Sequence, residues 1–412
     1  MFRWLMRDRR AFIRSLLTMP AAGAVAASEL NAASKKKLFH SARDVIGELG
    51  VRTFLNAAGT YTRLTASKMP PEVQSAMQGA STRYVNLDEL HAKAGDRIAR
   101  LLDADAALVT AGCASALTLA TAACIAGDDE DRIKLLPDTT GMKNEVVLQA
   151  AHRNSYDHAI RNAGVRLVEV ETARELEAAI NDRTAMLFFL NHAGNDGQIG
   201  HQEFVEIGKK HGVPTLNDAA ADVPPADNLF RFQRMGYDLV AFSGGKGLRG
   251  PQSAGLLVGR RDLIEAARLN NSPNSDSVGR SNKVNKEEVV GMLVALELFL
   301  DQDHDQAWKE WTRRCRRIER SVSSLPGVAT ETFVPEIANA VPHLRIRWNF
   351  SQSQLTAKAA AELLRDGNPS IEVRPNYDEG LEIAVWMLDP GDDRVVARRI
   401  HGVLSAAINA SA

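Results

Sequence analysis

This chain of 412 residues has few cysteines and almost no net charge. Three cysteines are too few for a disulfide framework. The formal net charge of −1 gives no general attraction to nucleic acid, so we expect no nucleic-acid partner. With 45% hydrophobic and 25% charged residues, the composition is that of a soluble globular protein.

Long apolar runs are also lacking. Beyond residue 30 no run is long enough to span a bilayer, so we expect no stable membrane anchor. There is no internal repeat and no low-complexity tract, which excludes repeat and solenoid architectures. The length suits one large domain and one smaller domain.

Residues 1–27 are typical of an export signal. The pair Arg9-Arg10 with Phe12 resembles a twin-arginine signal, and a modestly apolar stretch follows. Ala24-Val25-Ala26 matches the small-x-small pattern of a signal-peptidase site. The alternative is a basic amphipathic N-terminal helix. The first interpretation predicts a periplasmic protein that uses the twin-arginine export machinery, which moves folded proteins.

Alternating strand and helix patterns predict an α/β domain with a mostly parallel sheet. After about residue 285 the pattern changes to short strands between longer helices, which indicates a compact α+β domain. We therefore predict a linker and N-terminal arm over 28–70, a large domain over 71–284 and a small C-terminal domain over 285–412. The strands predicted in the large domain are 106–110, 145–148, 166–170, 184–190, 213–218, 238–242 and 254–258.

Lys246 directly follows the predicted strand 238–242. It lies in Ser243-Gly244-Gly245-Lys246-Gly247, where the glycines leave room for a flat ligand and Ser243 offers a hydroxyl. A fixed amine with an open approach is what a Schiff-base lysine for pyridoxal 5'-phosphate (PLP) needs. The alternative is a surface lysine in a glycine-rich turn.

Two further segments suit the same cofactor. Gly112, Cys113 and Ala114 link a strand to a helix N-terminus, where backbone N–H groups bind phosphate. We expect Cys113 to contribute its backbone N–H rather than its thiol. Asp218 ends an apolar strand, and a carboxylate there can pair with a protonated pyridine nitrogen. The alternative role for Asp218 is a helix N-cap.

Each of the three segments lies at the carboxyl end of a predicted strand, where open α/β sheets bind ligands. We predict that His152 stacks on the cofactor ring, with a capping or surface histidine as the alternative. Arg374 is a candidate for binding a substrate carboxylate, with a surface ion pair as the alternative. Arg280 and Lys283 are candidates for an anion of the substrate or of a partner subunit. We predict no metal site.

Five segments together resemble one known family. They are Leu55–Thr60, Met69–Val73, Asn217–Ala221, Ser243–Gly255 and Gly279–Val284. They are similar to the selenocysteine synthase-like group of fold-type-I PLP enzymes, nearest the D-glucosaminate-6-phosphate ammonia-lyase subgroup, over roughly residues 45–405. The resemblance implies an aspartate-aminotransferase-like fold with its active site at a homodimer interface, or in a larger assembly of dimers.

The substrate class is narrowed by what the chain lacks. The near-neutral charge, the export-type N-terminus and the lack of a separate basic domain argue against seryl-tRNA as the substrate. We predict a PLP-dependent lyase acting on a small amino acid or amino-sugar acid, with Lys246 as its proton carrier. An aminotransferase, a racemase and an exported non-catalytic binding protein remain alternatives.

Overall fold

The computed structural model describes residues 43–348, 355–376 and 380–409, so the predicted export signal lies outside the described residues. The described residues divide into two units, one that ends at Thr53 and one that begins at Phe54. In the first, a short helix α3 (Val45–Glu48) is capped by Asp44, whose side chain accepts a hydrogen bond from Gly47 N. Within the described parts of the chain, no helix is long and apolar enough to cross a membrane.

The second unit is built around a seven-stranded sheet in the order β2-β8-β7-β6-β5-β3-β4. Strand β8 runs antiparallel to both of its neighbours, and the other pairs are parallel. The predicted α/β fold with a mostly parallel sheet is therefore confirmed. The strands are β2 (Ala106–Thr110), β3 (Glu145–Gln149), β4 (Arg166–Val170), β5 (Thr184–Leu190), β6 (Thr215–Asp218), β7 (Leu239–Ser243) and β8 (Gly255–Gly259).

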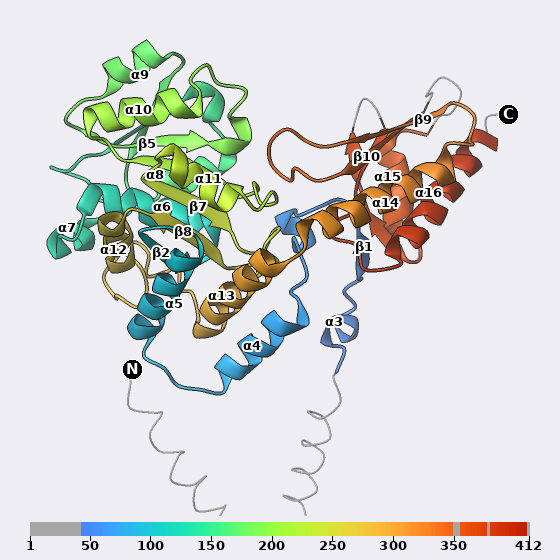
Figure 1. The fold of residues 1–412 in the computed structure, drawn as a ribbon, viewed down its shortest axis with the longest axis horizontal. Helices are drawn as coiled ribbons and strands as arrows, with labels where there is room; N and C mark the ends of the chain where they lie inside the picture. Colours follow the sequence, from blue (N-terminus) through green and yellow to red (C-terminus); the bar gives the residue numbers. More distant parts are fainter. Residues whose placement is uncertain (1–42, 349–354, 377–379, 410–412) are drawn as a thin grey trace, which may run out of the picture. The chain divides into compact units, whose positions relative to one another are not determined.

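Helices cover both faces of this sheet (Figure 1). The two apolar faces bury separate side-chain clusters, because side chains alternate across each strand. One face is covered by α6 (Gly112–Ala126), α7 (Glu130–Leu135), α8 (His158–Arg161) and α12 (Arg261–Leu269). The other is covered by α4 (Pro71–Ser81), α5 (Leu87–Leu101), α9 (Ala173–Ala179), α10 (His201–His211), α11 (Asn228–Met235) and α13 (Lys286–Asp301). Short 3-10 helices are η1 (Thr62–Leu64), η2 (Ala150–His152), η3 (Ser155–Asp157) and η4 (Asn191–Ala193).

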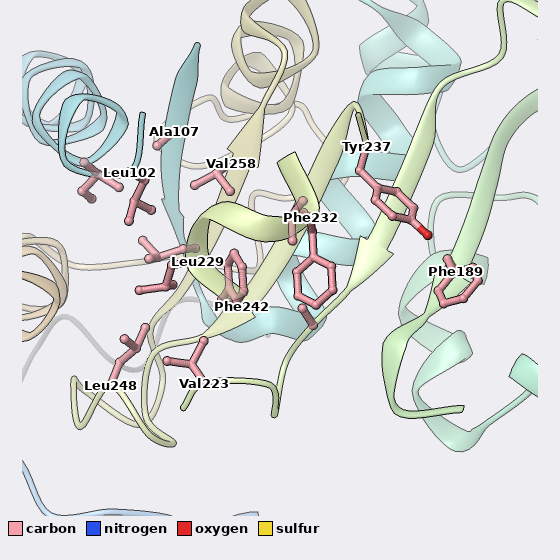
Figure 2. Packing of buried hydrophobic residues seen from close by; sticks show 14 of the residues in the cluster. Leu102, Ala107, Phe189, Val223, Leu229, Phe232, Tyr237, Phe242, Leu248 and Val258 are labelled. Carbon is pink, nitrogen blue, oxygen red and sulfur yellow. The ribbon is translucent and has the colours of Figure 1, made fainter. Parts of the chain in front are cut away.

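The loop that carries Lys246 is fixed by the core beneath it. Phe242, the second-last residue of β7, lies inside the core, and Leu248 returns to the same cluster two residues after Lys246. Figure 2 shows Leu248 and Val223 at one end of this cluster. Burying a leucine or phenylalanine side chain stabilises the fold by roughly 1.5–3 kcal/mol. The lysine loop is therefore held by buried side chains on both sides.

The C-terminal part forms a second core. A four-stranded antiparallel sheet has the order β12-β13-β10-β9 and packs on three helices. The predicted α+β architecture is thus present. The elements are β9 (Val328–Phe333), β10 (His343–Trp348), β12 (Arg374–Asn376), β13 (Gly380–Ala384), α14 (His304–Val322), α15 (Ala357–Asp366) and α16 (Asp392–Asn409).

Two elements lie on the other side of the predicted domain boundaries. The expected small domain over 285–412 includes α13, but Met292, Leu296 and Phe299 of α13 belong to the core of the large domain. The expected arm over 28–70 includes β1 (Phe54–Asn56), which pairs in parallel with β11 (Ser370–Glu372) beside the small domain. Both differences arise because packing partners, rather than sequence order, decide which core a segment joins.

Candidate active site

Asp218 lies buried at the carboxyl end of β6, and one of its carboxylate oxygens accepts two hydrogen bonds. Its Oδ1 accepts hydrogen bonds from Ala220 N at 3.0 Å and from Cys113 Sγ at 3.5 Å. Its Oδ2 has no hydrogen-bond partner among the described residues. Burial raises the pKa of Asp218, and the Ala220 N–H and the charge of Lys246 act in the opposite direction.

The Lys246 loop needs its glycines. A Cβ on Gly245 would lie 2.4 Å from Gln252 Cα, and one on Gly247 would lie 2.0 Å from Val223 O, so larger residues do not fit this backbone path. Ser67 stabilises the loop, because its Oγ donates a 2.7 Å hydrogen bond to Gly245 O. Lys246 Nζ makes no hydrogen bond or ion pair with any described residue. Its amine is therefore free to react.

The N-terminus of α6 has the features expected of an anion-binding site. The cap position, Ala111, offers no side-chain hydrogen bond to the first turn of this 15-residue helix. Ser115 Oγ, in that turn, is buried and has no partner in the described part of the chain. Gly255 of β8 allows the close approach, since a Cβ there would lie 2.5 Å from Gly112 C. Unpaired N–H groups and the helix dipole favour phosphate here.

Ser243 ends β7 opposite Gly255 of β8 and is half-buried. Its side chain makes no hydrogen bond to the described residues, so the hydroxyl is available to a ligand. The structure thus brings together the residues predicted for phosphate, ring nitrogen and amine chemistry: Gly112, Cys113, Ala114, Asp218, Ser243 and Lys246.

His152 is buried, so it is not a surface histidine. It is 0% exposed, and its ring stands edge-on to Phe189, with 4.4 Å between the ring centroids. Its Nδ1 accepts from Leu190 N at 3.2 Å, and Nε2 lies 3.2 Å from Gln149 Nε2. Burial lowers the pKa of His152 to about 4, so the ring is neutral at physiological pH. Its stacking on a cofactor stays a prediction.

The predicted substrate residues lie on other elements. Arg374 of β12 forms an ion pair with Glu382, with 3.2 Å between Nη1 and Oε2, and Arg345 binds the same carboxylate. Arg280 and Lys283 are exposed in the segment between α12 and α13. Their roles in binding a substrate or partner anion stay predictions.

The sequence analysis missed a second buried carboxylate. Asp222 is 2% exposed and accepts hydrogen bonds from Ala338 N at 3.1 Å and from the Asn191 side chain. Burial raises the pKa of Asp222 to about 6, and the negative charge of Asp218 adds to the shift. The exposed His192 lies close enough to act electrostatically on both carboxylates. Asn191 directly follows β5, so the strand-end rule that singled out Asp218 also points to Asn191.

Residues 54–310 match the family model described as L-seryl-tRNA selenium transferase (SelA). This match covers more than half of the chain. The chain belongs to this family.

Proteins to which the chain is similar are named for different reactions. The D-glucosaminate-6-phosphate ammonia lyase of Salmonella typhimurium is 30% identical over 88% of this chain and 99% of its own length. A 5'-C-glycyluridine monooxygenase-decarboxylase from Streptomyces is 31% identical over 86% of this chain and 91% of its own. A solved structure of D-glucosaminate-6-phosphate ammonia-lyase matches with a TM-score of 0.78 and 28% identity, over 89% of this chain and 100% of that one. A serine palmitoyltransferase from S. paucimobilis, at a TM-score of 0.56 and 14% identity over 87% of this chain and 89% of that one, shares the fold.

Membership in this family makes the protein a PLP-dependent enzyme of fold type I. The groups present fit that cofactor. An unpaired amine (Lys246) suits its aldehyde, and the free Oδ2 of Asp218 suits its ring nitrogen. The uncapped α6 N-terminus suits its phosphate.

Proposed function

We propose that the protein is a PLP-dependent lyase of the ammonia-lyase type, acting on a small amino acid or an amino-sugar acid. The observation that carries the proposal is the unpaired amine of Lys246 beside the buried carboxylate of Asp218. The similarity to an ammonia lyase over 99% of that enzyme's length supports the reaction type.

Each residue has a defined task in this proposal. Lys246 would hold the cofactor through Nζ, Asp218 would keep a proton on the ring nitrogen, and Ser243 with the α6 N-terminus would bind the phosphate. When bound, PLP supplies an electron sink for the substrate carbon that carries the amine. Lys246 Nζ would be the base that accepts the proton from that carbon.

The substrate anions need cationic partners. We propose that Arg374 binds the substrate carboxylate, for which it must leave Glu382. Arg280 and Lys283 are exposed and would bind an anion of the substrate or of a partner subunit. A homodimer or a larger assembly is part of the proposal. A light-scattering mass equal to one chain would contradict it.

Visible absorbance tests the cofactor assignment. Protein purified with PLP should show an absorbance band in the visible range that Lys246→Ala abolishes and the exposed control Lys358→Ala retains. A colourless wild-type protein would refute the proposal and favour a non-catalytic binding protein.

A substrate screen distinguishes the reactions. A lyase releases ammonia and a keto acid from a single amino acid or amino-sugar acid. An aminotransferase needs a keto-acid acceptor, and a racemase changes configuration without releasing ammonia. Oxygen-dependent decarboxylation is the second candidate, favoured by the 31% identity to a monooxygenase-decarboxylase. It would consume oxygen and release carbon dioxide.

We further propose that the protein is exported to the periplasm by the twin-arginine route. The support is the sequence of residues 1–27, above all Arg9-Arg10. Replacing both arginines by lysine should leave the protein in the cytoplasm. Unchanged export of that variant would rule out this route.

A further inference from the structure

The side chain of Cys113 donates a hydrogen bond that a role in phosphate binding would not require. Its sulfur lies 3.5 Å from Asp218 Oδ1, although Cys113 belongs to α6 and Asp218 to β6. The second bond to Oδ1 comes from Ala220 N, in the loop after β6. Two donors from different elements therefore fix one oxygen of the carboxylate and leave Oδ2 unpartnered among the described residues.

The thiol acts as a neutral donor in this contact. Cys113 is buried, and burial together with the Asp218 charge raises its pKa well above the usual value. The sulfur therefore keeps its proton, and that proton is directed at the carboxylate. The titratable groups that act electrostatically on Asp218 are Lys246, Asp222 and His192, and the neutral thiol of Cys113 adds orientation without adding charge.

The position of Cys113 connects two parts of the site. Gly112, with φ +77°, starts α6 so that the N–H of Cys113 lies in the uncapped first turn. The same residue thus offers its backbone to a phosphate and its side chain to Asp218.

We infer that Cys113 is a positioning residue whose S–H holds Oδ1 of Asp218 so that Oδ2 is presented to the ring nitrogen of the cofactor. The inference rests on PLP binding and is independent of which bond the enzyme breaks. Its test therefore uses cofactor affinity and cofactor protonation rather than turnover.

The test compares Cys113→Ala, which removes the donor, with Cys113→Ser, which restores one. Apoprotein is titrated with PLP, and the dissociation constant is measured from pH 5 to 9. The alanine variant should bind PLP about five- to tenfold more weakly, as expected for the loss of one hydrogen bond from a weak thiol donor. Losing a donor also raises the pKa of Asp218, so affinity on the acid side should fall at a higher pH than in wild type. The serine variant should recover both properties.

The ring nitrogen gives an independent signal. When 15N-labelled PLP is bound to the alanine variant, the chemical shift of the ring nitrogen should move towards the value of unprotonated pyridine. In the serine variant it should return to the wild-type value. Cys315→Ala is the matched control, because this buried thiol lies in the small domain, 3.7 Å from Pro342 O. It should leave affinity, pH profile and resonance unchanged.

A double variant separates the inferred role from a packing defect. In an Asp218→Ala background, Cys113→Ala should weaken PLP binding by less than twofold, because the side-chain oxygen that accepts from the thiol is gone. An equal loss in both backgrounds would overturn the inference, as would equal losses in the alanine and serine variants. An unchanged profile in Cys113→Ala would overturn it too.

Discussion

Replacing Asp222 by asparagine should stabilise the protein at neutral pH, although it changes a buried residue of the site. The folded pKa of Asp222 is about 6, against an ordinary value of 3.8. At about 1.36 kcal/mol per unit, this difference amounts to about 3 kcal/mol. A raised carboxyl pKa means that the folded state holds the proton more tightly than the unfolded state does. Stability is therefore lost as pH rises from 3.8 through 6.

Asparagine avoids this loss because it does not ionise. Its Oδ1 can still accept from Ala338 N, and Asn191 can flip its amide to face the new side chain. The gain in stability over wild type should grow from about 1 kcal/mol at pH 4.5 to about 3 kcal/mol at pH 7.5. With an unfolding entropy of about 2.1 cal/mol/K per residue for 412 residues, the larger gain corresponds to about 3 °C.

The assay is thermal unfolding of the apoprotein across this pH range, so that cofactor binding does not contribute. Asp276→Asn in an exposed loop is the matched control and should give no pH-dependent gain. A gain that is constant with pH would refute the reasoning, because it would not come from ionisation. A variant less stable than wild type at pH 7.5 would show that the hydrogen bonds of the carboxylate outweigh its burial.

Two further predictions concern the core and the lysine loop. Burial lowers the pKa of His152 and His201 to about 4 from 6.5, so the unfolded state takes up protons first. Stability should therefore fall as the pH drops from 6.5 to 4, by up to about 2 kcal/mol for each histidine at pH 5. The pH dependence of the unfolding midpoint should be weaker in His201→Gln, and an unchanged dependence would contradict this. Gly247→Ala places a Cβ 2.0 Å from Val223 O and should weaken PLP binding at least tenfold with the fold retained. Gly402→Ala, where nothing lies within 4 Å, should leave PLP binding unchanged, and equal losses in the two variants would show that the effect is not local.

Local sequence patterns were sufficient for much of the fold. The strand and helix periodicities predicted the mostly parallel sheet, and the bounds predicted for the strands 106–110, 166–170 and 184–190 agree with those observed. Local patterns could not assign α13 to a domain, because an apolar helix face can pack on more than one core. The pairing of β1 with β11 was equally hidden, because it joins segments from opposite ends of the second unit.

By itself the sequence determined which chemistry is available. Lys246 between glycines and Asp218 at a strand end are informative because side-chain type and strand position decide what a group can do. The tertiary structure alone decided how these groups are held. The Cys113 thiol on Asp218 and the buried Asp222 beneath Ala338 are contacts between distant segments. Such contacts depend on how helices and strands pack, and no local period encodes them.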